Sequence, residues 1–166
     1  CVSVIGGAMT NRTLRDTAMS FIDFETTGLS ARSGARVVEV SIVRVEPDGE
    51  PQVVLDTLID PEGPVLCTSI HGIDDEDVLG APRFTDILGE MIGALENSVV
   101  AAFNASFDIS FLTAEARLAP NTSKLRTPPY ICLMWMRPLL GLSKRCSLEA
   151  ACHQHGLRAG THRAAE

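Results

Sequence analysis

The chain has 166 residues, of which 45% are hydrophobic and 21% charged, and these values suit one globular domain with a sizeable core. No apolar run approaches the roughly 18 residues of a membrane span and no secretory signal opens the chain, so we expect a soluble, cytoplasmic protein. The net charge of −7 is unfavourable for binding nucleic acid, but the charges are unevenly distributed. Residues 1–100 hold 17 acidic and 6 basic side chains, whereas residues 101–166 hold 4 acidic and 8 basic ones, so the basic character lies in the C-terminal part.

Residues 1–17 carry no clear pattern and are expected to form an N-terminal arm, so that the domain runs from residue 18 to residue 166. Cys1 stands where a start Met is expected, and we therefore expect the biological start of the chain to lie upstream.

The stretch Phe21-Ile22-Asp23-Phe24-Glu25-Thr26-Thr27-Gly28 is predicted to be a strand that ends in a glycine turn. Because strand side chains alternate, Ile22 and Phe24 enter the core while Asp23 and Glu25 stand together on the opposite face. Two carboxylates that close repel each other, and a hard divalent cation between them is the usual solution. The stretch therefore predicts a metal site; the alternative is a half-buried strand whose polar residues simply face water.

Two further strands are predicted at residues 36–45 and 52–59, because both stretches are rich in β-branched residues and a Pro-Asp-Gly turn joins them as a hairpin. The acidic run Asp74–Asp77 is predicted to open a helix, since carboxylates favour helix N-termini. Residues 85–96 then show the apolar stripe of an amphipathic helix.

A strand and helix further along carry the next candidate ligand. Residues 98–103 are predicted to be a short buried strand, and residues 106–118 a helix. The side chains that this helix is expected to bury are Phe107, Phe111, Ala114 and Leu118. Asp108 lies in its first turn, off that stripe, and is expected to face a cleft. An acid that only neutralises the helix dipole is the alternative, but the position directly after a strand and Asn104 favours a metal ligand.

The C-terminal part offers fewer candidate ligands. Residues 130–140 are apolar and are predicted to be core, and residues 147–155 are predicted to be a helix. The two histidines of that helix face different directions, and the five cysteines form no Cys-x-x-Cys pair, so neither a zinc site nor a disulfide framework is expected. Thr161 is predicted to cap a last helix that carries His162 in its first turn.

Three blocks together carry a resemblance to a known family: the Phe21–Gly28 stretch, Asn-Ala-Ser-Phe-Asp at 104–108, and Thr-His-Arg-Ala-Ala-Glu at 161–166. In this order they resemble the DEDDh, or DnaQ-like, 3′-to-5′ exonucleases, which include polymerase proofreading subunits and ribonuclease T. The resemblance runs from about Ser20 to the last residue. It implies an α/β fold of the ribonuclease H-like type, a mixed five-stranded sheet flanked by helices. The pattern looks most like the proofreading subunits of bacterial DNA polymerase III.

The resemblance also implies roles for single residues. Asp23 would bridge two divalent ions, Mg²⁺ or Mn²⁺, with Glu25 on the first ion and Asp108 completing the set. His162 would be the general base for the attacking water. The residues expected to contact the terminal nucleotide are Thr26, Thr27, Gly28, His71, Asn104 and Phe107. For His71 a purely structural role is the alternative, because a lone loop histidine is more often structural.

The main departure from the family pattern is its fourth carboxylate. The pattern has His, four residues, then Asp, and this Asp would be residue 167, one past the last residue. We expect it in the continuation of the chain; the alternative is a domain that ends here and is impaired. Smaller departures are Phe103, where many relatives carry His, and Cys132-Leu133, where many carry Asp-Thr.

The resulting hypothesis is a metal-dependent 3′-to-5′ exonuclease acting on single-stranded DNA, alone or beside a DNA polymerase. The alternatives are an RNA-directed exonuclease of the ribonuclease T or oligoribonuclease type, and a non-catalytic module that binds nucleic acid or a polymerase. A phosphate backbone could follow basic residues of the C-terminal part, and the alternative is that these residues form an ordinary solvated face. They are Arg117, Lys124, Arg126, Lys144, Arg145 and Arg163. With only 8 aromatic residues, a short site for the last few nucleotides is expected rather than a long stacking platform.

Overall fold

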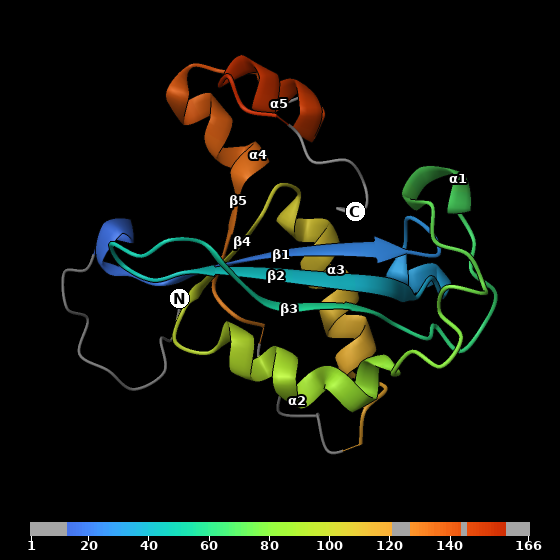
Figure 1. The fold of residues 1–166 in the computed structure, drawn as a ribbon. Coiled ribbons are helices and arrows are strands. Elements are labelled where there is room, and N and C mark those ends of the chain that lie inside the picture. The colour runs from blue at the N-terminus through green and yellow to red at the C-terminus, as the bar shows by residue number, and fades with distance from the viewer. Residues whose placement is uncertain (1–12, 121–126, 144–145, 159–166) are drawn as a thin grey trace.

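The computed structural model describes residues 13–120, 127–143 and 146–158, and its centre is a five-stranded sheet with the strand order β3-β2-β1-β4-β5 (Figure 1). The strands are β1 (Met19–Thr26), β2 (Val37–Val45), β3 (Gln52–Leu58), β4 (Val99–Ala102) and β5 (Tyr130–Cys132). β1 pairs antiparallel with β2 and parallel with β4, so it lies in the middle of the sheet. The predicted mixed five-stranded sheet is confirmed.

Helices connect the strands and cover the sheet. The α-helices are α1 (Thr68–His71), α2 (Phe84–Leu95), α3 (Ala105–Ala116), α4 (Leu133–Met136) and α5 (Leu148–Gln154). Short 3₁₀ helices span Leu14–Asp16, Ala31–Ser33 and Arg137–Leu140. Figure 1 shows α4 and α5 beyond the end of β5, well away from α2. No helix in the described segments is long and apolar enough to cross a membrane.

The core lies between one face of the sheet and helices α2 and α3. Along β1, Ile22 and Phe24 are buried, whereas Asp23 is exposed on the other face. The same alternation continues into β2, because Ile22 lies opposite Ile42 and Phe24 lies opposite Val40. All four apolar residues belong to one buried cluster that also contains side chains of α2 and α3. The predicted alternation of β1 is therefore confirmed.

The buried face of α3 differs from the predicted stripe. Leu118 lies past the end of the helix and is 59% exposed, and Phe107 is only half-buried. The buried residues of α3 are Ala105, Asp108, Ile109, Phe111, Leu112, Glu115 and Ala116. The expectation that Asp108 stands off the buried face is therefore wrong. Backbone N–H groups of the sheet donate hydrogen bonds to two carboxylates on this face. A pattern of apolar residues does not predict such hydrogen bonds.

The prediction that residues 130–140 are core is also wrong. Trp135, Leu139 and Leu140 are 60%, 81% and 72% exposed. The physical reason is topological: β5 is the edge strand of the sheet, and α4 follows it directly at that edge. An apolar stretch at the edge of a sheet has fewer neighbours to pack against than the same stretch at its centre.

The acidic run closes a turn and does not open a helix, so this prediction is wrong as well. The Asp74 carboxylate accepts the N–H groups of Glu76 and Asp77, at 2.9 and 3.2 Å, and the Asp77 carboxylate accepts the N–H of Asp74 at 2.9 Å. Such side-chain bonds to nearby backbone compete with helix formation. The next helix, α2, begins only at Phe84.

Phe84→Ala tests the packing of α2 against β1. The Phe84 side chain is fully buried and its ring centroid lies 6.0 Å from that of Phe24. The substitution leaves a cavity, so we expect the free energy of unfolding to fall by about 3–5 kcal/mol in urea denaturation followed by circular dichroism. The control is Leu79→Ala, since Leu79 is 86% exposed and its loss should change this free energy by less than about 0.5 kcal/mol. Equal unfolding midpoints for both variants would contradict this packing.

Candidate active site

Asp108 lies next to the acids of β1 at the edge of this strand that faces β4. β4 pairs with β1 only over residues 19–21, and beyond them no described strand lies on that side of β1. Helix α3 takes this place, and Asp108 Oδ1 accepts the N–H of Phe24 at 3.3 Å. The side chain of Asp108 thus lies beside the backbone between Asp23 and Glu25, although it comes 84 residues after Phe24 in the chain.

Asp108 is a buried acid among other acids. Its side chain is 4% exposed, and burial is the main cause that raises its pKa from 3.8 to about 7. The negative charge of Asp23 raises this pKa further and that of Glu25 adds a smaller contribution, while the backbone N–H groups of Asp108 and Phe24 offset only part of the rise. Such a carboxylate favours a bound proton or cation. Within the described residues, however, no three His, Cys, Asp or Glu side chains are close enough together to hold a metal ion.

Residues 27–36 form a loop after β1 that Thr27 and Arg36 close at its base. The N–H of Thr27 donates to the carbonyl of Arg36 at 2.8 Å, and the N–H of Arg36 donates to Thr27 Oγ1 at 2.9 Å. Thr26 Oγ1 donates to the carbonyl of Gly28 at 2.8 Å. A Cβ on Gly28 would lie 3.3 Å from a side chain across the loop, a tight contact. The two threonines therefore shape this loop, and close packing favours glycine at position 28.

His71 is buried, and both of its ring nitrogens contact backbone. Nε2 lies 3.0 Å from the carbonyl oxygen of Leu66, and Nδ1 accepts the N–H of Ile73 at 3.1 Å. Its side chain is 2% exposed. Together these contacts favour a neutral ring with its proton on Nε2. They also favour the structural interpretation of His71, as part of the framework of the segment around α1.

Two further predicted residues lie at the start of α3. Asn104 directly precedes the helix, is exposed, and accepts the hydroxyl of Ser106 on Oδ1 at 3.0 Å. Phe107 lies in the first turn, with its ring centroid 4.8 Å from that of Phe111. The structure thus places Asp108 beside the segment of β1 that carries Asp23 and Glu25, near the start of α3, whereas His162 lies outside the described residues.

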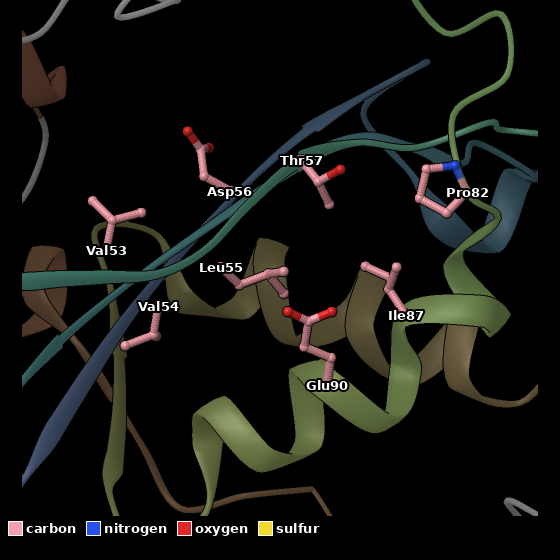
Figure 2. Close-up of a pocket in the computed structure, with 8 residues that line it drawn as sticks. All are labelled: Val53, Val54, Leu55, Asp56, Thr57, Pro82, Ile87 and Glu90. Atoms are coloured by element: carbon pink, nitrogen blue, oxygen red, sulfur yellow. The ribbon is translucent and has the colours of Figure 1, made fainter.

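The rest of the described surface adds little to this site. Of the six basic residues expected along a phosphate backbone, only Arg117 lies in the described part, where it is exposed. A groove of about 410 Å³ lies between β3 and α2 (Figure 2), and none of the predicted site residues lines it. Its lining residues are Val53, Val54, Leu55, Asp56, Thr57, Pro82, Ile87 and Glu90. The candidate site is therefore the meeting point of β1 and α3.

Sequence reasoning missed one buried acid, Glu115. Its side chain is 2% exposed, accepts the N–H of Val37 at 3.0 Å and binds Arg36 through both carboxylate oxygens, at 2.8 and 3.0 Å. The hydrogen bonds that Arg36 donates to the Glu115 carboxylate raise the pKa of Arg36. The spacing of Glu115 from Asp108 could have indicated its burial. Residues seven apart on a helix lie on the same face, so Glu115 shares the face of Asp108.

Comparison with known proteins gives related sequences over most of the chain. The profile of a family described as Exonuclease matches residues 20–166. A DNA polymerase III subunit epsilon-like protein of Rhodobacter capsulatus is 30% identical over 141 residues, which cover 81% of this chain and 19% of that protein. DNA polymerase III subunit epsilon of Treponema pallidum is 33% identical over 105 residues, covering 61% and 47%. The chain thus spans less than half of the length of either relative.

A similar fold occurs among solved structures. The zinc-bound form of a complex of E. coli Exonuclease I with single-stranded DNA matches with a TM-score of 0.58 and 16% identity, covering 75% of this chain and 30% of that one. At this level of identity the likeness concerns the fold, a mixed five-stranded sheet with flanking helices.

Asp108→Asn should stabilise the metal-free protein at pH 8. Because the folded-state pKa of about 7 exceeds the ordinary value of 3.8, the folded state binds more protons between these values, and stability falls as the pH rises through that range. An amide does not ionise, so the variant should be more stable than the unsubstituted protein at pH 8, by up to about 4 kcal/mol, and the gain should shrink toward pH 4. Urea unfolding in EDTA at both pH values measures this. Asp56→Asn, on an exposed strand residue, is the control; a gain for Asp108→Asn that does not vary with pH would contradict the raised pKa.

Proposed function

Because the chain belongs to the exonuclease family, we propose that it is a metal-dependent 3′-to-5′ exonuclease that hydrolyses phosphodiester bonds at the 3′ end of single-stranded DNA. The observation that carries this proposal is Asp108, a buried carboxylate with a pKa of about 7 beside the acids of β1. A cation is attracted to such a carboxylate, and a donor set made of carboxylate oxygens suits Mg²⁺ or Mn²⁺.

Three acids would hold two ions here, as the DEDDh resemblance implies: Asp23 as the bridging ligand, with Glu25 and Asp108 beside it. Bound there, the ions would stabilise the attacking and leaving oxygens of an in-line displacement. Asp108 supports this role because its carboxylate is only partly compensated by backbone N–H groups. His162, which lies outside the described residues, would accept the proton of the attacking water.

The terminal nucleotide would lie between the loop of residues 27–36 and the start of α3, since both directly adjoin the candidate carboxylates. The contacting residues would be Thr26, Thr27, Gly28, Asn104 and Phe107. The hydrogen bonds between Thr27 and Arg36 hold this loop next to Glu25. His71 would act through the shape of its own segment, because backbone groups occupy both ring nitrogens.

Single-stranded DNA is proposed as the substrate and a DNA polymerase as a partner because of the names of similar proteins. Both relatives described above are named as, or as like, the epsilon subunit of DNA polymerase III, and the similar solved structure is a complex with single-stranded DNA. An RNA substrate, or binding without hydrolysis, is an outcome that the experiment below distinguishes.

Asp23→Asn should abolish digestion of a 5′-labelled single-stranded DNA oligonucleotide. With the full-length protein and Mg²⁺ or Mn²⁺, we expect a ladder that shortens from the 3′ end and that EDTA prevents. The substitution removes the charge of the bridging ligand, so the rate should fall by at least about 100-fold, more than the loss of a residue that only supports a ligand. The matched control is Asp56→Asn, because Asp23 and Asp56 both lie opposite Ser41 and so share one face of the sheet.

Three outcomes would change the proposal. Digestion by Asp23→Asn at the rate of Asp56→Asn would show that the carboxylates of β1 do not carry the reaction. Faster digestion of an RNA oligonucleotide of the same sequence, in direct competition, would change the substrate to RNA. An intact oligonucleotide that remains bound to the protein would favour a non-catalytic binding module.

A further inference from the structure

Glu115 binds the sheet from the same face of α3 as Asp108. The two acids are seven residues apart, which is about 10.5 Å along a helix axis. Asp108 accepts the N–H of Phe24 in β1, and Glu115 accepts the N–H of Val37 at the start of β2. Helix α3 is thus attached to two neighbouring strands at two points, one near each of its ends.

The attachment at Glu115 is the stronger of the two. Asp108 accepts its one strand N–H at 3.3 Å. Glu115 accepts three hydrogen bonds, from the N–H of Val37 at 3.0 Å and from Arg36 Nε and Nη2 at 2.8 and 3.0 Å. The contact with Arg36 pairs a guanidinium with both carboxylate oxygens, which adds geometric specificity as well as energy. Of the two polar attachments of α3 to the sheet, the one at Glu115 therefore restrains the helix more.

Arg36 connects this attachment to the loop that follows β1. Its backbone closes the loop through two hydrogen bonds with Thr27, and its side chain also contacts Glu62 at 3.2 Å. The register between β1 and β2 shifts between Glu25 and Thr26, so Thr26 lies opposite Val37. Irregularities of this kind redirect side chains. The ion pair of Glu115 and Arg36 therefore lies where β1 ends and the loop of residues 27–36 begins, next to the candidate site.

We propose that Glu115 and Arg36 are positioning residues, which hold Asp108 where its carboxylate shares an ion with Asp23 and Glu25. This proposal rests on the proposed function. A helix that has lost its attachment at Glu115 shifts or rotates on the sheet, and Asp108 moves away from β1. The expected consequence is weaker metal binding, whereas hydrolysis at saturating metal is changed much less.

Glu115→Gln and Arg36→Lys test the proposal in the full-length protein. Glu115→Gln keeps the shape of the side chain but removes its charge, and Arg36→Lys keeps the charge but removes the two-pronged contact. Mn²⁺ binding is measured by electron paramagnetic resonance, without substrate, and the half-saturating Mg²⁺ concentration is measured in DNA digestion. We expect Glu115→Gln to weaken Mn²⁺ binding and to raise the half-saturating Mg²⁺ about 10-fold, with Arg36→Lys in between.

The matched control is Glu46→Gln. Glu46 pairs with Arg44 at 2.6 Å, at the other end of β2, so this variant also takes a charged partner from an arginine. It should bind Mn²⁺ as the unsubstituted protein does. Circular dichroism and thermal melting show how much of each variant is folded. A purely structural loss would lower the number of Mn²⁺ sites without changing their affinity.

The outcomes separate this proposal from the proposed function. Unchanged Mn²⁺ affinity in both Glu115→Gln and Arg36→Lys, with the unsubstituted protein binding Mn²⁺, would overturn the positioning role alone. No Mn²⁺ binding by the unsubstituted protein, or binding that Asp23→Asn leaves intact, would overturn the proposed function and this proposal with it. Weaker affinity in Glu115→Gln, a smaller loss in Arg36→Lys and none in Glu46→Gln would support both.

Discussion

The candidate site depends on two hydrogen bonds, which backbone N–H groups of the sheet donate to side chains of helix α3. The N–H of Phe24 donates to Asp108 and the N–H of Val37 donates to Glu115, and both acceptors lie on the buried face of α3. A buried carboxylate is costly unless donors or cations compensate its charge. Arg36 compensates the charge of Glu115. Among the described residues Asp108 has only backbone donors, and its pKa rises to about 7. This difference in compensation is why we propose a structural role for Glu115 and a role in the reaction for Asp108.

The topology of the sheet explains why Asp108 can reach β1 at all. β4 is only four residues long and pairs with the first part of β1, after which the chain turns into α3. The second half of β1 carries Asp23 and Glu25 and has α3 in place of a strand at that edge. Alternation along β1 places Asp23 and Glu25 on the same face of the strand. Because β4 is short and is followed directly by α3, Asp108 comes to lie beside this part of β1. The chain belongs to the exonuclease family, and these are the acids that the proposed function assigns to the hydrolysis.

Much of the fold could be predicted because its signals are local. The alternation of β1, the hairpin of β2 and β3, and the stripe of α2 all lie within short windows of sequence, and the structure has these elements within one or two residues of the predicted bounds. The errors come from long-range contacts. Arg36 and Glu115 are 79 residues apart, so no local pattern shows that α3 buries two acids. The stretch that begins with β5 reads as core because it is apolar, but its place at the edge of the sheet leaves Trp135 exposed. The acidic run near Asp74 forms its own turn, since its carboxylates bind neighbouring backbone N–H groups.

The measurement that tests the central claim most directly is an anomalous-difference map from crystals of the full-length protein grown with Mn²⁺. If α3 brings Asp108 to the acids of β1 in order to bind a cation, a strong peak will lie within coordination distance, about 2.1 Å, of carboxylate oxygens of both Asp23 and Asp108. A map with manganese bound only elsewhere, and with Asp108 still bonded to Phe24 and remote from any ion, would contradict it.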